Sequence, residues 1–194
     1  MLVAEKKITL DEYMKMPIGA PYQYIDGYLI PWPSRTTMHQ LVLGNIIRSF
    51  LNYEEENGGI CFMGPIETIL DDHNSFQPDF VYITEERREI VKDYIYGAPD
   101  FVVEILEIRN AYYDLRPKKD IYEKYGVNEY LITDPLLQNA DLYVLKDGAY
   151  YLHQKAQKSE MLPSARLPNL IFDMNIVFND TEWLISNYNK KEGS

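Results

Sequence analysis

Pro78-Asp-Phe-Val-Tyr-Ile83 and Asp100-Phe-Val-Val-Glu-Ile-Leu106 are short apolar runs rich in β-branched and aromatic residues, which is typical of buried β-strands. Each run carries an acid, Asp79 in the first and Glu104 in the second. A buried carboxylate destabilises a fold unless another group pairs with it. Two carboxylates on neighbouring strands can hold one divalent cation, because Mg²⁺ takes oxygen ligands and keeps several of its waters. The two runs therefore predict a sheet with a candidate metal site.

The residues alone leave two other interpretations of these acids open. Asp79 follows a proline and could cap a turn, because aspartate side chains often accept hydrogen bonds from nearby backbone. Glu104 could form a buried ion pair with Lys118 or Arg109. Strand alternation points Glu107 away from the site.

The segments around the two runs alternate between strands and helices. Asp26-Gly27 and Asp147-Gly148 favour the tight turns of two hairpins, and Thr9 begins a capping box at the start of a short helix. Pro117 is expected in the first turn of a helix that ends at Gly126. The predicted strands and hairpins cover residues 22–32, 60–70, 78–84, 100–107, 129–134, 141–155 and 170–178. The predicted helices cover 9–16, 34–56, the segment around Pro117 up to Tyr125, and a last segment from 181.

A helix between the strands at 100–107 and 129–134 predicts that these strands are parallel, since a parallel pair needs a crossover connection. The pattern indicates an α/β (α+β) fold with a mixed central β-sheet flanked by helices and with additional β-hairpins. At 194 residues, the chain is expected to form one domain over residues 1–194.

Composition restricts the classes of function. No uninterrupted apolar stretch approaches the roughly 18 residues of a membrane span, and residues 1–7 lack the order of a signal peptide, so a cytoplasmic protein without membrane contact is expected. Cys61 is the single cysteine and the three histidines are scattered, which argues against disulfides and structural zinc. A formal charge of −11 argues against a passive binder of polyanions.

One basic segment follows the acid-bearing strand directly. From Arg109 to Lys124 there are five bases and three acids, a local charge of 5 − 3 = +2. Such a run is often only a solvated helix face, but here it also supplies candidates for nucleic-acid contacts, namely Arg109, Arg116 and Lys119. Tyr112, Tyr113 and Tyr122 are candidates for stacking on bases.

In these motifs the sequence resembles the PD-(D/E)XK nuclease superfamily, and within it a widespread bacterial family of restriction-endonuclease-like proteins long catalogued as a domain of unknown function. The resemblance runs from about Thr9 to Pro135 and rests on the order and spacing of several weak motifs. These motifs are Tyr22-Gln-Tyr-Ile-Asp-Gly-Tyr-Leu29, His39-Gln40, Gln77-Pro-Asp79, Gly97-Ala-Pro-Asp-Phe-Val-Val-Glu-Ile-Leu106, Asp114-Leu-Arg-Pro-Lys118 and Tyr125-Gly-Val-Asn-Glu-Tyr-Leu-Ile-Thr-Asp-Pro135.

The resemblance implies a restriction-endonuclease-like fold and a role for each matching position. Asp79 and Glu104 would be the catalytic acids that bind Mg²⁺ or Mn²⁺, together with the carbonyl of Ile105. The plain motif has its lysine two residues after the second acid, where this chain has Leu106. The family's lysine lies on the following helix, which implies that Lys118 is the catalytic lysine.

Other residues around the motif are expected to support the metal ligands without binding the metal. Gln23, His39 and Asp114 are the candidates for this role, and His39 has no partner histidine at ligand spacing. The family's glutamates near the Asp-Gly turn are replaced here by Gln23 and Tyr28. Its Ser-Pro-Ser-Thr after the second acid is replaced by residues 107–110, Glu-Ile-Arg-Asn.

These observations support three hypotheses. The first is a metal-dependent endonuclease that hydrolyses phosphodiester bonds of DNA and pairs as a homodimer, because a double-strand cut needs two sites. The second is a catalytically degenerate nuclease-fold protein that binds nucleic acid or another protein. The third is a small-molecule hydrolase with Asp79 and Glu104 as a general acid/base pair, for which the sequence offers neither a nucleophile elbow nor a histidine partner.

Overall fold

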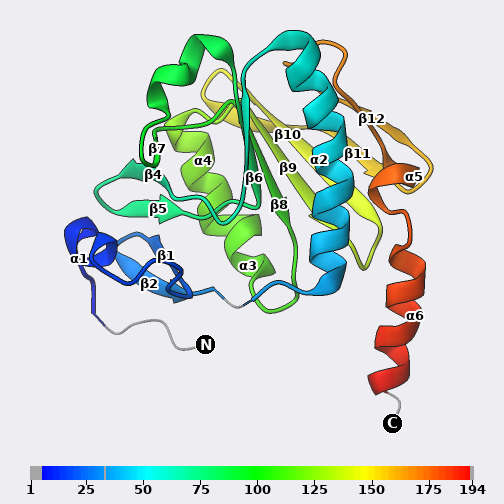
Figure 1. Cartoon of the computed structure of the whole chain (residues 1–194), viewed down its shortest axis with the longest axis horizontal. Coiled ribbons are helices and arrows are strands. Elements are labelled where there is room, and N and C mark those ends of the chain that lie inside the picture. Colours follow the sequence, from blue (N-terminus) through cyan, green and yellow to red (C-terminus); the bar gives the residue numbers. More distant parts are fainter. Residues whose placement is uncertain (1–5, 33, 193–194) are drawn as a thin grey trace.

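The computed structural model describes residues 6–32 and 34–192, and its main element is a mixed sheet of six strands (Figure 1). The strand order is β11-β10-β9-β8-β6-β3. The β8–β9 pair is parallel, as predicted, and the other neighbours in this sheet are antiparallel. The strands are β3 (Ile60–Met63), β6 (Phe80–Ile83), β8 (Phe101–Ile105), β9 (Glu129–Asp134), β10 (Asn139–Lys146) and β11 (Ala149–Gln157).

A second sheet of five strands, in the order β2-β1-β5-β4-β7, lies beside the first. The predicted single strand over 60–70 is wrong, because the chain leaves the large sheet after β3 and enters the small sheet at β4. The β4–β5 hairpin has no glycine in its turn; instead, the Asp71 carboxylate accepts hydrogen bonds from the His73 amide (2.7 Å) and the Asn74 side chain (3.0 Å). The strands are β1 (Tyr22–Ile25), β2 (Tyr28–Pro31), β4 (Thr68–Asp71), β5 (Asn74–Phe76) and β7 (Ile95–Tyr96).

The helices follow the predicted order, with differences at their ends. Thr36 caps the long helix α2 by accepting from the His39 amide, and Gly58 ends it. The other elements are α1 (Leu10–Met14), α2 (Thr37–Asn57), the 3₁₀ helix η1 (Glu85–Ile90), α3 (Ala111–Tyr113), the π-helical segment η2 (Asp114–Lys118), α4 (Lys119–Tyr125), α5 (Met174–Val177), α6 (Thr181–Glu192), and the β12 (Met161–Pro163) and β13 (Ile171–Asp173) pair.

Two predicted features of these elements are wrong. Pro117 lies inside η2, seven residues into the continuous helical segment that starts at Ala111, and not in a first turn. Proline cannot donate the usual helical hydrogen bond, and a π-turn accommodates that defect. The extended stretch predicted over 170–178 ends at Asp173, because the Asp173 carboxylate accepts from the Asn175 amide and begins α5.

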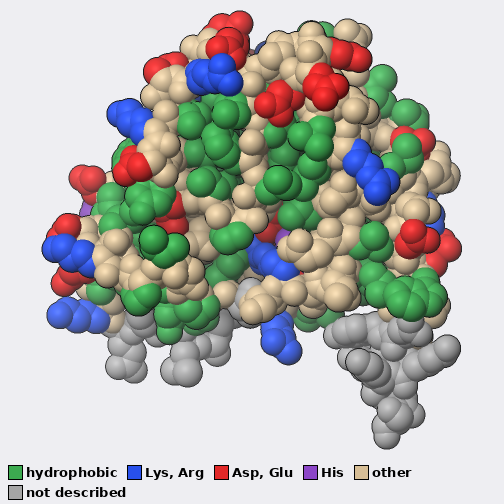
Figure 2. Space-filling view, viewed as in Figure 1, with side chains coloured by type: hydrophobic (Ala, Val, Ile, Leu, Met, Phe, Trp, Pro, Cys, Tyr) green, Lys and Arg blue, Asp and Glu red, His purple; other side chains and the backbone are tan. Residues whose placement is uncertain are grey.

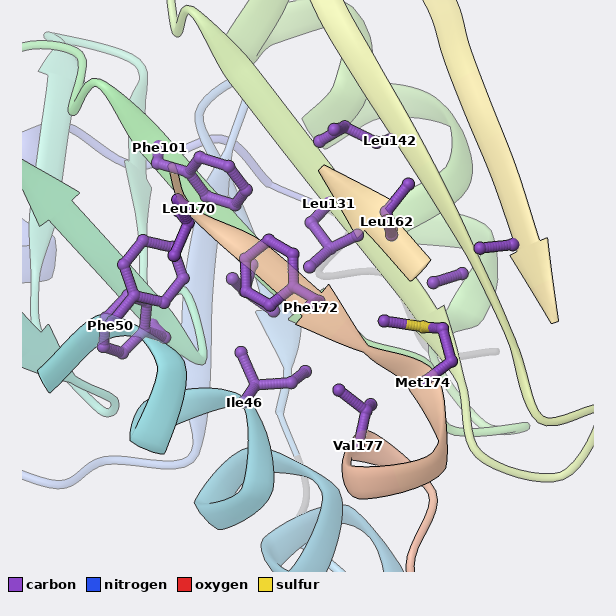
Figure 3. Close-up of a cluster of buried hydrophobic side chains, with 14 of the residues drawn as sticks. Ile46, Phe50, Phe101, Leu131, Leu142, Leu162, Leu170, Phe172, Met174 and Val177 are labelled. Atoms are coloured by element: carbon purple, nitrogen blue, oxygen red, sulfur yellow. The ribbon is translucent and has the colours of Figure 1, made fainter. Parts of the chain in front are cut away.

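Strand alternation sends the side chains of β8 into two different cores. Phe101, Val103 and Ile105 face α2, α5 and β13, whereas Val102 faces α4 and the small sheet. Figure 3 shows the first core, where Phe50 and Phe172 meet between α2 and β13 with ring centroids 5.5 Å apart. Glu104 shares the Val102 face, so the strand points a carboxylate at the second core.

No helix within residues 6–32 and 34–192 is long and apolar enough to span a bilayer. The absence of a signal peptide was predicted mainly from residues 1–5, and these lie outside the described residues.

Candidate active site

Asp79 directly precedes β6 and lies beside the end of β8 that carries Glu104. Phe80, the first residue of β6, pairs with Val103 of antiparallel β8. The backbone amide of Ile105, the residue after Glu104, donates to the Asp79 carboxylate. Both acidic side chains are buried, at 3% and 0% exposure. Two acids separated by 25 positions in the chain are therefore brought to neighbouring backbone segments.

Three groups surround the Asp79 carboxylate. Its Oδ1 accepts a hydrogen bond from Nη2 of Arg35 (2.6 Å), and its Oδ2 accepts from the backbone amide of Ile105 (2.8 Å). Nε2 of His39 lies 2.9 Å from the same Oδ2. Burial acts to raise the pKa of Asp79, but contact with His39 and the charge of Arg35 outweigh it, so this pKa lies below its ordinary value. Asp79 is thus held as a carboxylate.

Glu104 belongs to a second cluster that is closed to solvent. The Lys118 ammonium contacts Oε1 of Glu104 and lies 2.8 Å from Oδ1 of Asp114, and the Tyr122 hydroxyl donates to the same Oε1 at 3.0 Å. Lys118 has 0% exposure. Burial raises the pKa of Glu104 to about 8 against the opposing charge of Lys118, and burial likewise raises the pKa of Asp114. The two carboxylates raise the pKa of Lys118 despite its burial.

The π-helical turn explains why Lys118 faces this cluster. The Tyr130 hydroxyl of β9 donates to the carbonyl of Asp114 (3.0 Å), which fixes the start of the turn against the sheet. At the other end, the ammonium of Lys118 lies 4.6 Å from the centre of the Trp32 ring. Lys119, one position further, lies instead over the ring of Tyr143. The structure therefore brings Lys118, and not Lys119, to the acids.

The remaining predicted site residues lie at different distances from this centre. Gln23 is fully buried, and its amide group donates to the carbonyl of Gln77, two residues before Asp79, at 3.5 Å. Arg109 and Arg116 are exposed. On the face shown in Figure 2, Lys and Arg side chains are scattered among Asp and Glu and form no continuous basic patch.

The three tyrosines that were candidates for stacking on bases differ in their exposure. Tyr112 is 61% exposed and accessible to a ligand, whereas Tyr113 and Tyr122 are buried and cannot stack on bases. Tyr122 is instead the hydroxyl donor to Glu104. Its position on the inner side of α4, facing a buried carboxylate, explains this role.

Arg35 was not predicted as a site residue, and the predicted orientation of Glu107 is wrong. β8 ends at Ile105, so strand alternation no longer governs Glu107. The Glu107 carboxylate accepts from the amide of Thr36 (2.8 Å) and lies 4.0 Å from Nη1 of Arg35. Arg35 precedes α2 in a segment without a recognisable motif, and only the folded loop carries it to Asp79.

A cavity of about 380 Å³ adjoins the Asp79 side of the site, and Trp32, Arg35, His39, Gln77 and Asp79 are among its lining residues. Gly64 lies on its wall, where the Gly64 amide donates to the carbonyl of Asp79 at 2.8 Å. A Cβ at Gly64 would lie 2.3 Å from the carbonyl oxygen of Pro78. Glycine here permits the close approach that fixes the backbone of Asp79.

The donor set suits a hard divalent cation. Oε2 of Glu104 and Oδ2 of Asp114 are buried carboxylate oxygens without a hydrogen-bond partner in the structure. Such oxygens are costly to bury unless a cation or water pairs with them. No cluster of three or more His, Cys, Asp or Glu side chains with metal-site geometry occurs in the described part of the chain. Mg²⁺ needs only one or two carboxylates beside its waters, so the residues present fit it.

The fold of this chain is shared with a solved structure. The crystal structure of a "putative nuclease belonging to DUF820" from Anabaena variabilis matches 91% of this chain and 99% of its own, with a TM-score of 0.73 and 20% sequence identity. The type IIG restriction endonuclease BpuSI matches over 79% of this chain and 17% of its own, with a TM-score of 0.40 and 13% identity.

Residues 10–175 match the family model described as "Uma2: Putative restriction endonuclease". The chain therefore belongs to this family, and the resemblance found in its sequence is confirmed. No curated protein matches it.

Proposed function

We propose that this chain is a Mg²⁺- or Mn²⁺-dependent endonuclease that hydrolyses phosphodiester bonds of DNA. The observation that carries the proposal is that Asp79 is held by the Ile105 amide beside Glu104, and that the buried Lys118 ammonium contacts Glu104. Family membership supports the same class of reaction. The proposal treats residues 1–194 as one domain, located in the cytoplasm and acting as a homodimer.

In this proposal each residue has a defined task. Asp79, Glu104 and the Ile105 carbonyl would hold the cation, which supplies an activated water and stabilises negative charge on the phosphate when bound. The amide of Ile105 orients the Asp79 carboxylate through its 2.8 Å hydrogen bond. Asp114 holds the Lys118 ammonium 2.8 Å away and so directs its positive charge at the Glu104 side of the site. Arg109, Arg116 and Lys119 are proposed to contact the nucleic-acid backbone.

The test combines a binding and a cleavage measurement on the full chain. Calorimetric titration of EDTA-treated protein with Mn²⁺ should give one site per chain, and Asp79→Asn should abolish it. Plasmid cleavage in Mn²⁺ should be lost in Asp79→Asn and in Lys118→Met, whereas Arg88→Gln, at a surface ion pair with Glu85, should behave as wild type. Absence of Mn²⁺ binding by the wild type at millimolar concentration would overturn the proposal.

A second candidate function is a nuclease-fold module that binds nucleic acid or protein without cleavage. One observation favours it: both oxygens of Asp79 are already paired, with Arg35, His39 and the Ile105 amide. The replacement of the family's glutamate by Gln23 also favours this second candidate. DNA binding by the wild type without cleavage in any divalent metal would support this second candidate.

A further inference from the structure

Arg35 occupies the oxygen of Asp79 that a metal ion would need. Nη2 of Arg35 is the hydrogen-bond donor to Oδ1, at 2.6 Å, while Oδ2 is shared by the Ile105 amide and His39. The Ile105 amide belongs to the sheet and cannot move away without breaking β8. A cation binding to Asp79 therefore competes first with the guanidinium of Arg35.

The surroundings of Arg35 allow its side chain to leave. The residue lies between β2 and α2, outside any helix or strand, and its side chain is 15% exposed. Its guanidinium carbon lies 4.5 Å from the centre of the Trp32 ring, a contact that accepts several in-plane orientations. Glu107, 4.0 Å away, is too distant for a tight ion pair. Asp79 is thus the strongest contact that holds the guanidinium in place.

The cavity beside Asp79 gives the displaced guanidinium a destination. Arg35, Trp32 and Asp79 all line this space of about 380 Å³. A phosphodiester in the cavity would offer the planar, bidentate acceptor that a guanidinium prefers. His39 also lines the cavity. Its side chain is buried, at 1% exposure, and its Nδ1 has no hydrogen-bond partner in the described structure.

We propose that Arg35 is an exchanging phosphate ligand, which pairs with Asp79 in the metal-free protein and transfers to a substrate phosphodiester in the adjoining cavity when a divalent cation takes Asp79. The inference rests on the proposed function, since it assumes a metal at Asp79 and a nucleic-acid substrate. It assigns the cavity to the phosphate backbone of DNA. It also predicts that the metal and the substrate bind cooperatively, because each favours the same position of Arg35.

The test measures metal and DNA binding separately in Arg35→Gln. Without DNA, calorimetric titration should show Mn²⁺ binding about tenfold tighter than in wild type, because a competing charge-assisted hydrogen bond is gone. With Ca²⁺ in place of Mg²⁺, a fluorescein-labelled DNA duplex should bind about tenfold more weakly to the variant, because one charged phosphate contact is lost. Arg88→Gln, a surface arginine paired with Glu85, should match wild type in both titrations.

The opposite signs of the two effects separate this role from a structural one. A variant with merely damaged structure would lose affinity for Mn²⁺ as well as for DNA, and unchanged or weaker Mn²⁺ binding by folded Arg35→Gln would overturn the inference. If neither wild type nor variant binds Mn²⁺, the proposed function itself fails. If Arg35→Gln does not fold, NMR of the arginine side chains in the wild type decides, with diamagnetic Mg²⁺ in place of Mn²⁺. Mg²⁺ should shift the Arg35 guanidinium signal. No shift at saturating Mg²⁺ would refute the exchange.

Discussion

Replacement of Lys118 by methionine should destabilise the metal-free protein by about 4 kcal/mol at pH 7. Lys118, Glu104 and Asp114 are all buried, and the ammonium is within contact of both carboxylates. Methionine has a similar length but no charge, so the variant leaves both carboxylates without their common cation. Only a proton can then neutralise the added negative charge without opening the fold.

The magnitude follows from the cost of that proton. A carboxyl with an unfolded pKa near 4 is neutralised at pH 7 at a cost of about 1.36 kcal/mol for each of about 3 pH units, roughly 4 kcal/mol. This agrees with the ~3–5 kcal/mol measured when one partner of a buried ion pair is removed. Burial already raises the pKa of Glu104 to about 8 with Lys118 present, so the variant must bind one further proton than the wild type.

The direction of the pH dependence is fixed by the same argument. In the variant the folded-state pKa of the carboxyl lies above its unfolded value. The stability difference from wild type is therefore smallest near pH 4 and grows by about 1.36 kcal/mol for each unit that the pH rises, until the folded-state pKa is reached. We expect a destabilisation of about 1 kcal/mol at pH 5 and about 4 kcal/mol at pH 7.

Urea unfolding of EDTA-treated protein, followed by circular dichroism at pH 5, 6, 7 and 8, measures this difference. The matched control is Lys119→Met, because Lys119 is adjacent in sequence but lies over the Tyr143 ring; its loss should cost about 1 kcal/mol or less at every pH. The reasoning is refuted if Lys118→Met unfolds within 1 kcal/mol of wild type at pH 7, or if its destabilisation is the same at pH 5 and pH 8.

Three other predictions concern packing and reactivity. Phe172→Ala should lower the free energy of unfolding by about 3–5 kcal/mol in the same urea assay, because the ring is fully buried against Phe50; a loss below 1 kcal/mol would contradict this packing. Gly64→Ala should weaken Mn²⁺ binding in calorimetry, since its Cβ would lie 2.3 Å from the Pro78 carbonyl and push the site backbone away; wild-type affinity would exclude that effect. Burial raises the pKa of the Cys61 thiol, so a disulfide reagent at pH 8 should label it far more slowly in folded than in urea-unfolded protein, and equal rates would disprove the shift.

Local sequence rules were sufficient where the interactions are local. The hairpin at Asp26-Gly27 forms as predicted because these two residues adopt the positive φ angles, 51° and 84°, that such a turn needs. The Thr9 capping box also forms as predicted, because all of its partners lie within three residues. The β4–β5 hairpin was not predicted, because its turn relies on hydrogen bonds to the Asp71 carboxylate instead of an Asp-Gly pair.

Local sequence identified some residues of the candidate site and missed others. Asp79, Glu104 and Lys118 were identified from apolar runs and a matching motif. The β6–β8 pairing then brings Asp79 beside β8, and η2 brings Lys118 to Glu104. Arg35 could not be predicted, because its contact with Asp79 spans 44 positions and depends on a loop between β2 and α2. Glu107 was assigned the wrong direction, since periodicity does not show where β8 ends.

The sequence by itself determined the Asp-Gly hairpins, the capped helix starts, the parallel β8–β9 crossover and the two candidate acids, because periodicity, caps and turn residues act over a few positions. Only the tertiary structure decided which backbone amide orients Asp79, which lysine reaches Glu104 and which arginine already pairs with Asp79. These outcomes depend on strand register, on the π-helical turn and on loop placement. Each is fixed by packing between segments far apart in the chain, which no local pattern of residues encodes.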